Sequence, residues 1–474
     1  MRNEPAPELP ASIEWINCAP ASLQSLRGTV TLVAFWSAGS AYCHNLLEDL
    51  RQLQHKFSGA LQVIALHTPK FDAERNPQLL RKVCNQLGVG VRVAHDPAFV
   101  AWQHYAIAAW PTVAVVDASG VLREYIIGDR QRDALEALVT QLIGEIGKQS
   151  YDAQSLQLRQ TEPSTALSFP SGLCATERLL YVADSGHNSV LECTFDGRIM
   201  RRFGSGTADF MDGITAAASF RRPRGLSVAR DTLFVADTGN HALRRIRLAD
   251  GDVLTVAGSG APGQPVEAAV SAGNARALVL NQPWDVAAAD DRVFIAMAGC
   301  NQIWALDRIQ NRFVHVAGSG MLGVVDGEGS DSAFAHPAGL ALVHSLLYVA
   351  DAAGSAVRSL QISTGKVQTL LGQGLFDFGD ITGQRAEAKL QYPLALAKDP
   401  DAPYVWVLDS YNNVIKKLRL GGGEVLRFDI EHKLHRPSAL AIAQGSLWVA
   451  NTDAHEVLRI DAASGAVRRL PIGE

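Results

Sequence analysis

Two hydrophobic patterns alternate along the first 147 residues. An apolar run with β-branched residues at 30–36 predicts a buried strand. Leucines at three- and four-residue steps then predict an amphipathic helix that ends near Phe57. The same reasoning gives strands at 61–66, 91–93, 112–116 and 124–127, and helices at 77–87, from 99, and at 132–146. Strands that alternate with helices predict a mainly parallel sheet covered on both faces, with an antiparallel pair at one side.

From about residue 155 a unit of four short strands recurs instead. Each unit begins at a proline, and the prolines are 44 to 60 residues apart: Pro170, Pro223, Pro283, Pro337, Pro393 and Pro437. The second strands and their turns read YVADSGHN, FVADTGNH, FIAMAGCN, YVADAAGS, VWVLDSYNN and LWVANTDA. Six such units predict a six-bladed β-propeller, because radial repetition leaves only short, protected sheet edges.

An aspartate ends the second strand of four units: Asp184, Asp237, Asp351 and Asp409. We expect each carboxylate to stabilise its turn by accepting hydrogen bonds from backbone N–H groups two residues on, while the following Gly or Asn tolerates positive φ. Met297 and Asn451 take this place in the third and sixth units, which therefore need another stabiliser.

The fold class that follows is multidomain, α/β followed by all-β. We place the first domain at 1–150, a linker at 151–164 and the propeller at 165–474. Two segments compete to close the propeller ring: 156–158, and the last strand at 466–472, which completes the sixth unit. The sequence does not decide between them.

Both halves resemble known families. The small-Asp-x-Gly-x-Asn turn followed by VxTVAGSG resembles NHL repeats, and WINCAPASLQSLRGTVTLVAFW, with Ala109-Trp110-Pro111-Thr112, resembles the TlpA-type thioredoxin fold and its cis-proline loop. This domain order resembles the NHL repeat-containing protein 2 family, of which the chain looks like a bacterial-type member. Animal members carry a further C-terminal β domain, and we expect this chain to lack it.

The thioredoxin motif departs from the pattern at its reactive position. Redox-active members place CxxC at the start of the first long helix, where the first thiolate attacks a disulfide and the second resolves it. Aligned on that pattern, FWSAGSAYCHNLLEDL puts Ser40 at the nucleophile and Cys43 at the resolving position. A serine hydroxyl does not attack disulfides at neutral pH, so ordinary dithiol exchange is not expected.

Three interpretations of this motif remain open. Ser40 caps the helix and Cys43 is a buried hydrophobe; or Cys43, alone or with Cys84, is a redox-sensing thiol; or the surroundings of Ser40, Tyr42, Trp110 and Pro111 dock an extended peptide without reacting. The last needs the exposed aromatic ring that we expect at Trp110.

The charge of the chain and its cysteines limit the partners and the compartment that we expect. The net charge is -5, with 13 basic and 15 acidic residues before residue 154 and 30 and 33 after it, so neither half attracts nucleic acid or an anionic membrane in bulk. Arg244 and Arg247 alternate with apolar residues, which predicts a solvated outer face. The six cysteines form no CxxC, and the start lacks a secretory pattern, so we expect a cytoplasmic protein with reduced thiols.

The residues before the six prolines are expected at the mouth of the propeller channel: Phe169, Arg222, Gln282, His336, Tyr392 and Arg436. His336 has no second or third histidine at this level, so the set predicts a small-molecule or peptide pocket rather than a metal site. Asp212-Gly213 and Asp326-Gly327 lack the spaced oxygen ligands of a calcium loop and are interpreted as turns.

The sequence thus favours a non-catalytic scaffold with a protein or peptide partner, without cofactor or metal. The alternative is a thiol-dependent oxidoreductase or peroxide sensor that uses Cys43. The oligomeric state does not follow from the sequence.

Overall fold

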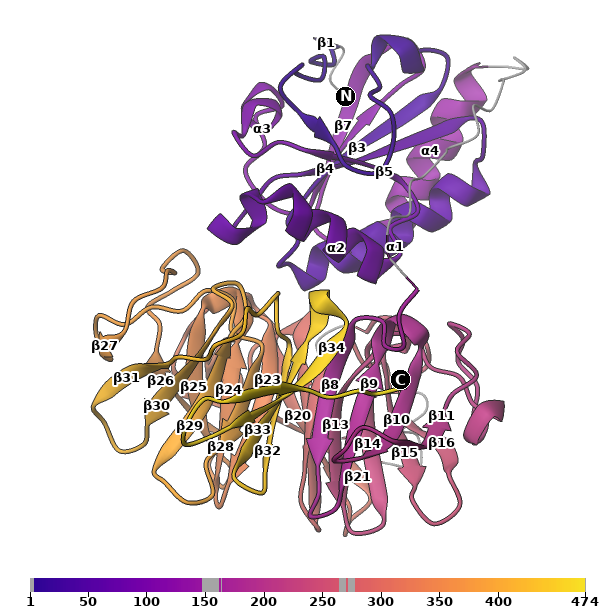
Figure 1. The fold of residues 1–474 in the computed structure, drawn as a ribbon. Coiled ribbons are helices and arrows are strands. Elements are labelled where there is room, and N and C mark those ends of the chain that lie inside the picture. The colour runs from indigo at the N-terminus through magenta and orange to yellow at the C-terminus, as the bar shows by residue number, and fades with distance from the viewer. Residues whose placement is uncertain (1–3, 147–161, 163, 264–269, 272–277, 474) are drawn as a thin grey trace. The chain divides into compact units, whose positions relative to one another are not determined.

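The computed structural model describes residues 4–146, 162, 164–263, 270–271 and 278–473, which divide into two compact units, 1–163 and 164–474 (Figure 1). Nearly all of the expected linker, 151–164, lies outside the described residues, as does the candidate closing segment 156–158.

The first unit is built on a seven-stranded mixed sheet in the order β1-β7-β6-β3-β4-β5-β2. Parallel pairing is confined to β3–β4–β5, and every other pairing is antiparallel, so the expectation of a mainly parallel sheet was wrong in this detail. The strands are β1 (Glu4–Pro5), β2 (Glu14–Trp15), β3 (Val30–Trp36), β4 (Leu61–His67), β5 (Arg92–His95), β6 (Thr112–Val116) and β7 (Val121–Ile127).

Side-chain alternation along the central strands divides the core of this unit into two clusters. Val30, Leu32 and Val63 point to the face covered by α1, α2 and α4, whereas Phe35 and Leu66 point to the face covered by α3. The helices are α1 (Ala41–Lys56), α2 (Pro77–Leu87), α3 (Val100–His104) and α4 (Arg132–Ile146). The expected helices are therefore confirmed, and the peptide bond between Trp110 and Pro111 is cis, as the resemblance implied.

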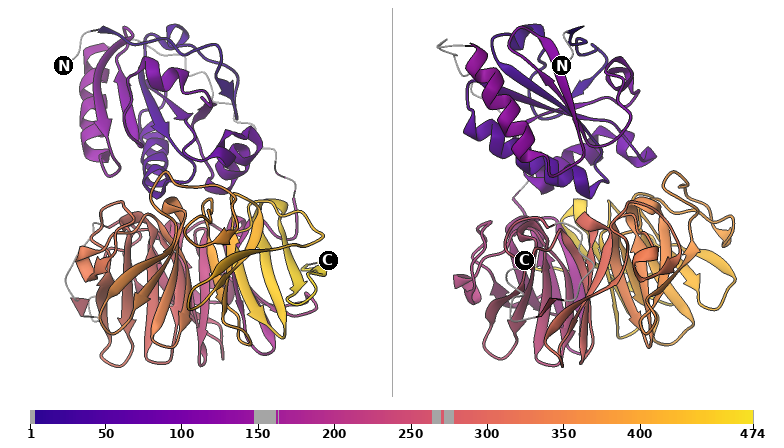
Figure 2. Two further views of the ribbon diagram at one scale, coloured as in Figure 1. Left: turned by 90° about the vertical axis from the view of Figure 1, so that its left-hand side faces the viewer. Right: turned by 180° about the vertical axis from the view of Figure 1, so that it is seen from behind.

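The second unit is the six-bladed propeller, in which each blade is an antiparallel sheet (Figure 2). The innermost strand of each blade follows its proline, and the next three strands lie successively further out. From inside outwards, blades one to three are β8 (Pro170–Ala175), β9 (Leu179–Asp184), β10 (Ser189–Thr194), β11 (Ile199–Phe203); β13 (Pro223–Ala229), β14 (Thr232–Asp237), β15 (Ala242–Arg247), β16 (Asp252–Ala257); β18 (Pro283–Ala288), β19 (Arg292–Met297), β20 (Gln302–Asp307), β21 (Arg312–Ala317). Blades four to six are β23 (Pro337–Val343), β24 (Leu346–Asp351), β25 (Ala356–Gln361), β26 (Lys366–Leu371); β28 (Ala395–Lys398), β29 (Tyr404–Asp409), β30 (Val414–Arg419), β31 (Glu424–Phe428); β32 (Ala439–Ala443), β33 (Ser446–Asn451), β34 (Glu456–Asp461), β35 (Val467–Arg469).

Blades two to five carry a fifth, two-residue outer strand supplied by the long connection that precedes them. These strands are β12 (Gly213–Ile214), β17 (Val270–Ser271), β22 (Gly327–Glu328) and β27 (Gly383–Gln384). Each pairs with the fourth strand of the following blade, so the connection covers that edge instead of leaving it open.

The turn carboxylates bind a more distant partner than expected. Asp184, Asp237, Asp351 and Asp409 each accept a hydrogen bond of 2.7 or 2.8 Å from a backbone N–H that lies 16 or 18 residues earlier, in the connection entering the innermost strand. After Asp184, Asp237 and Asp351 the turn is a 3-10 segment, and the carboxylate makes no side-chain cap hydrogen bond to it. Asn451 does the same for His435 through its amide oxygen.

Neighbouring blades are joined by a repeated hydrogen bond. The residue that ends each second-to-third-strand turn has positive φ, and its side chain accepts the backbone N–H of the residue before the next blade's proline. The six pairs are Asn188–Arg222, His241–Gln282, Asn301–His336, Ser355–Tyr392, Asn413–Arg436 and His455–Phe169, at 2.6 to 3.3 Å.

The last of these pairs also closes the ring, since His455 lies in blade six and Phe169 precedes blade one. Thr452 adds a hydrogen bond of 2.8 Å to the carbonyl of Pro170. The chain end, with Leu470 and Ile472, packs into the core of blade one, where Figure 1 places the C-terminus beside β9 and β10. Within the described residues, closure therefore uses packing and side-chain bonds, and no strand is shared between the two blades.

Candidate functional site

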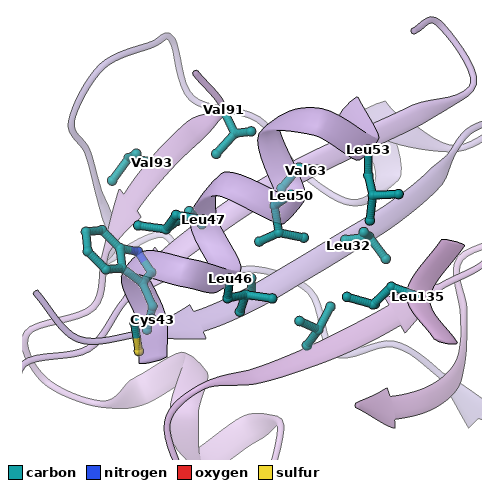
Figure 3. Close-up of a cluster of buried hydrophobic side chains, with 14 of the residues drawn as sticks. Leu32, Cys43, Leu46, Leu47, Leu50, Leu53, Val63, Val91, Val93 and Leu135 are labelled. Carbon is teal, nitrogen blue, oxygen red and sulfur yellow. The ribbon is translucent and has the colours of Figure 1, made fainter. Parts of the chain in front are cut away.

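The start of α1 holds the two residues of the degenerate redox motif. Ser40 is the N-cap: its backbone is extended, and its hydroxyl accepts the N–H of Cys43 at 3.4 Å. Cys43 is fully buried, and its Sγ accepts the N–H of Ser37 at 3.5 Å. Figure 3 shows Cys43 at one end of the cluster of leucines and valines between α1 and the sheet.

Burial raises the pKa of the Cys43 thiol to about 12, although the hydrogen bonds from Ser40 and Ser37 oppose the shift. Burial also raises the pKa of Cys84 to about 12. All six cysteines lie in the described residues and are free thiols. The thiol at the resolving position is thus part of the core, and its thiolate is strongly disfavoured.

The cis-proline loop lies less open than expected. Pro111 is buried, and Trp110 is only partly exposed because its ring packs against Trp102 in a tilted arrangement at 4.6 Å and its Nε1 donates to Oγ1 of Thr68 at 2.7 Å. The ring that we expected to be exposed is therefore exposed only in part. Tyr42, in the first turn of α1, is also partly buried.

A buried acid supports the loop before α1, and sequence reasoning missed it. Glu74 is fully buried and accepts the N–H of Gly39 at 2.7 Å, the N–H of Lys70 at 2.9 Å and the hydroxyl of Ser37 at 2.9 Å. Nε2 of His67 lies 3.5 Å from the same carboxylate. Burial raises the pKa of Glu74, but His67 and the hydrogen bonds outweigh it and leave the pKa below its usual value.

The hydrogen-bond network of Glu74 extends through His67 to the imidazole ring of His95. Nδ1 of His67 and Nδ1 of His95 are 3.0 Å apart. The carboxylate oxygens of Glu74 accept backbone N–H groups, including that of Gly39 directly before Ser40. This network therefore fixes the position of the motif and does not leave Glu74 as an open catalytic base. Glu74 stands among polar and charged residues in FDAERN, and no local pattern marks it as buried.

In the propeller, the six residues before the prolines all adopt positive φ, between 43 and 61°. This conformation costs a non-glycine residue roughly 1–2 kcal/mol, and at every position the backbone N–H donates to the preceding blade. The structure brings two of these side chains into direct contact: the hydroxyl of Tyr392 lies 3.2 Å from Nδ1 of His336. Phe169 instead packs on His455 at 4.4 Å, and Arg436 binds Asp453 at 2.6 Å.

The channel behind these residues is a cavity of about 240 Å³ lined by the innermost strand of every blade. Two channel-side residues were missed by the sequence analysis, Trp284 and Asp285. Burial raises the pKa of Asp285 to about 7, although its carboxylate accepts the N–H groups of Val286 and Leu340. Arg224, on the innermost strand of blade two, is buried and 5% exposed.

The arginines of β15 differ in part from the expectation. Arg247 is exposed as predicted, but Arg244 is fully buried and binds Asp237 at 2.8 Å and Asp212 at 3.0 Å. Arg358 binds Asp351 and Asp326 in the same way, and Lys416 binds Asp409 and Asp380. The Asp-Gly segments therefore anchor the long connections to buried cations.

None of the helices in the described residues is long and apolar enough to cross a bilayer. The same residues contain no cluster of three or more His, Cys, Asp or Glu side chains arranged to hold a metal ion.

Comparison with known proteins agrees with this architecture. The AhpC/TSA family model matches residues 3–125. SUPPRESSOR OF QUENCHING 1, a chloroplastic protein of Arabidopsis thaliana, is 33% identical over 97% of this chain and 47% of its own length. NHL repeat-containing protein 2 of Gallus gallus is 28% identical over 99% of this chain and 72% of its own length. Thiol-disulfide oxidoreductase YkuV of Bacillus subtilis is 25% identical over 30% of this chain and 96% of its own. The chain thus spans about half the length of the plant relative.

Proposed function

As a homologue of NHL repeat-containing protein 2 over nearly its whole length, the chain belongs with the proteins that join a thioredoxin-like domain to an NHL-repeat propeller, and we propose that it acts by binding a protein or peptide partner. In this proposal its thioredoxin-like domain has kept the fold and lost dithiol exchange.

The observation that carries the proposal is the environment of Cys43. Disulfide exchange needs an accessible thiolate, and Cys43 is fully buried with a pKa of about 12. At pH 7 a thiol with that pKa is ionised in about one molecule in 10⁵, compared with roughly three in a hundred for an ordinary thiol. Ser40 supplies no second thiol and is used as a helix cap.

Partly exposed aromatic rings support a binding role. The rings of Trp102 and Trp110 pack against each other in a tilted arrangement at 4.6 Å, and neither is fully buried. Rings with an apolar face and a polar tip are typical of surfaces that recognise other molecules. The channel mouth of the propeller adds a second set of aromatic and polar side chains.

The test is maleimide labelling of the full chain at pH 7, followed by mass spectrometry, with Cys43→Ala to assign the modified peptide. We expect Cys43 to react more than about a thousandfold more slowly than a free thiol, and not to be oxidised by mild peroxide. The chain unfolded in urea, in which all six thiols are accessible, serves as the positive control for labelling. Fast, selective labelling of Cys43 that peroxide pre-treatment abolishes would overturn the proposal and favour a one-cysteine redox protein.

A further inference from the structure

Arg224 is the second residue of β13 and is a buried cation without a carboxylate partner among the residues that the structure describes. Its guanidinium lies 3.9 Å from the centroid of the Trp284 ring. Other buried cations of the propeller, Arg244 and Arg436 among them, are bound to carboxylates. An unpaired buried charge is costly, so Arg224 requires an explanation that its neighbours do not.

Arg224 lies on the innermost strand of blade two, which lines the channel. The pKa of its guanidinium is lowered to about 9, mainly by burial; the positive charges of Arg436 and Arg222 act in the same direction, and Tyr392 opposes them. Tyr392 and Arg436 precede blades five and six, and Trp284 belongs to blade three. The contact with Trp284 joins blade two to blade three, and both Trp284 and the residue after Arg224 line the channel cavity.

Asp285, an acid that lines the channel cavity, does not form an ion pair with Arg224. Asp285 follows Trp284, but its two oxygens accept the backbone N–H groups of Val286 and Leu340, at 2.9 and 2.8 Å. Its ionisation is governed by burial and those two hydrogen bonds. Asp453, the other nearby carboxylate, binds Arg436 through both of its oxygens.

The Trp284 ring that covers the guanidinium belongs to a row of aromatic contacts. Trp284 packs edge-on against His336 at 4.4 Å, and Tyr392 contacts His336 and stacks on Tyr411 at 4.4 Å. A guanidinium that stacks by its face keeps its N–H edge for an in-plane acceptor, and a carboxylate matches that edge with two parallel hydrogen bonds.

We propose that the mouth of the propeller channel binds a carboxylate, which pairs with Arg224 while an apolar or planar body packs against Trp284, His336 and Tyr392. This assignment rests on the proposed function, in which the chain is a binding protein, and adds the chemical class of the ligand. One unpaired guanidinium matches one negative charge, which favours a carboxylate over a doubly charged phosphate. The carboxylate is carried either by a free small molecule or by the C-terminus of a peptide.

The test is isothermal titration calorimetry of the full chain with four probes: benzoate, the tripeptide Gly-Gly-Phe, the same tripeptide with an amidated C-terminus, and inorganic phosphate. Binding of benzoate or of the free tripeptide, without binding of the amide, supports the proposal. Benzoate alone identifies a small-molecule site, and the free tripeptide alone identifies a peptide C-terminus. Binding of neither carboxylate, equal binding of the amide, or tighter binding of phosphate overturns it.

Two variants separate recognition from folding. Arg224→Met is expected to weaken carboxylate binding about 10- to 100-fold, because a charge-assisted hydrogen-bond pair is lost. It should also raise the melting temperature of the ligand-free chain, since a buried charge without a partner is replaced by an apolar side chain. Arg245→Met, an exposed site on β15, is the control and should change neither quantity.

A lower melting temperature for Arg224→Met, or unchanged binding, would overturn the assignment and give Arg224 a structural role. The maleimide test of Cys43 is independent of this result, so failure here leaves the loss of dithiol exchange to be judged separately.

Discussion

Replacing Arg244 by methionine tests how blade two holds its long connection. The fully buried guanidinium binds Asp237 at 2.8 Å and Asp212 at 3.0 Å, and donates to the carbonyl oxygens of Ser219 and Met211 at 2.9 and 2.7 Å. Methionine fills most of the volume but leaves the fully buried Asp237 without its cation. Removing one partner of a buried pair costs about 3–5 kcal/mol.

Some compensation remains at the carboxylate of Asp237, which keeps the N–H of Arg221 at 2.8 Å and the amide of Asn240 at 2.9 Å. We therefore expect the lower part of that range. Adding Asp237→Asn to the methionine variant should recover part of the loss, because the amide oxygen can still accept the N–H of Arg221 without a stranded charge.

Hydrogen exchange measured by mass spectrometry on peptides of β14 and β15 is the suitable assay, because it reports on this blade within a two-domain chain. A loss of 3 kcal/mol corresponds to about a 150-fold decrease in protection. Arg245→Met on the same strand is exposed and should change protection by less than about threefold. Equal effects of the two substitutions, or a double variant less stable than Arg244→Met alone, would refute this reasoning.

Two further predictions concern the other sites. Ser40→Cys should enable the chain to reduce insulin disulfides in the presence of dithiothreitol, because the new thiol lies at the partly exposed N-cap of α1, where the helix lowers a thiol pKa. Ser40→Ala and the unmodified chain should stay inactive. Activity of the unmodified chain would contradict the prediction. Burial raises the pKa of Asp285 to about 7 in the folded chain, so between about pH 4 and 7 the folded state binds a proton that the unfolded state has released, and the free energy of unfolding should fall as the pH rises through this range. Asp285→Asn should remove this fall, which amounts to up to about 4 kcal/mol at pH 8. Urea midpoints measured across the pH range test this, and an unchanged pH slope in the variant would show that Asp285 titrates normally.

Most of the architecture could be predicted from the sequence because its signals are local and repeated. A proline and a turn acid recur in the propeller, and helical periodicity marks α1, α2 and α4. The partners of the turn acids could not be predicted, since the N–H groups they accept lie in a different part of the blade. The hydrogen bonds from Asn188 and its equivalents to the next blade have the same non-local character.

The misplacement of Arg244 has a physical cause. Its charge suggests exposure, but side chains three positions apart on a regular strand lie on opposite faces, so Arg244 shares the buried face of Ile246 while Arg247 lies on the exposed face. Arg358 in β25 of blade four is buried in the same way. Arg224 and Glu74 were missed for a related reason: charged residues in polar surroundings give no sequence signal of burial.

The way the ring closes has a mechanical consequence. Blades six and one are joined by the same kind of hydrogen bond as every other pair, together with the apolar contacts of Leu470 and Ile472. A tension applied between Pro170 and the C-terminal residues would load these contacts in shear and would not have to pull a shared strand out of a sheet. The seam should therefore yield before any blade does, and it should reseal quickly, since the last residues need only re-dock on blade one.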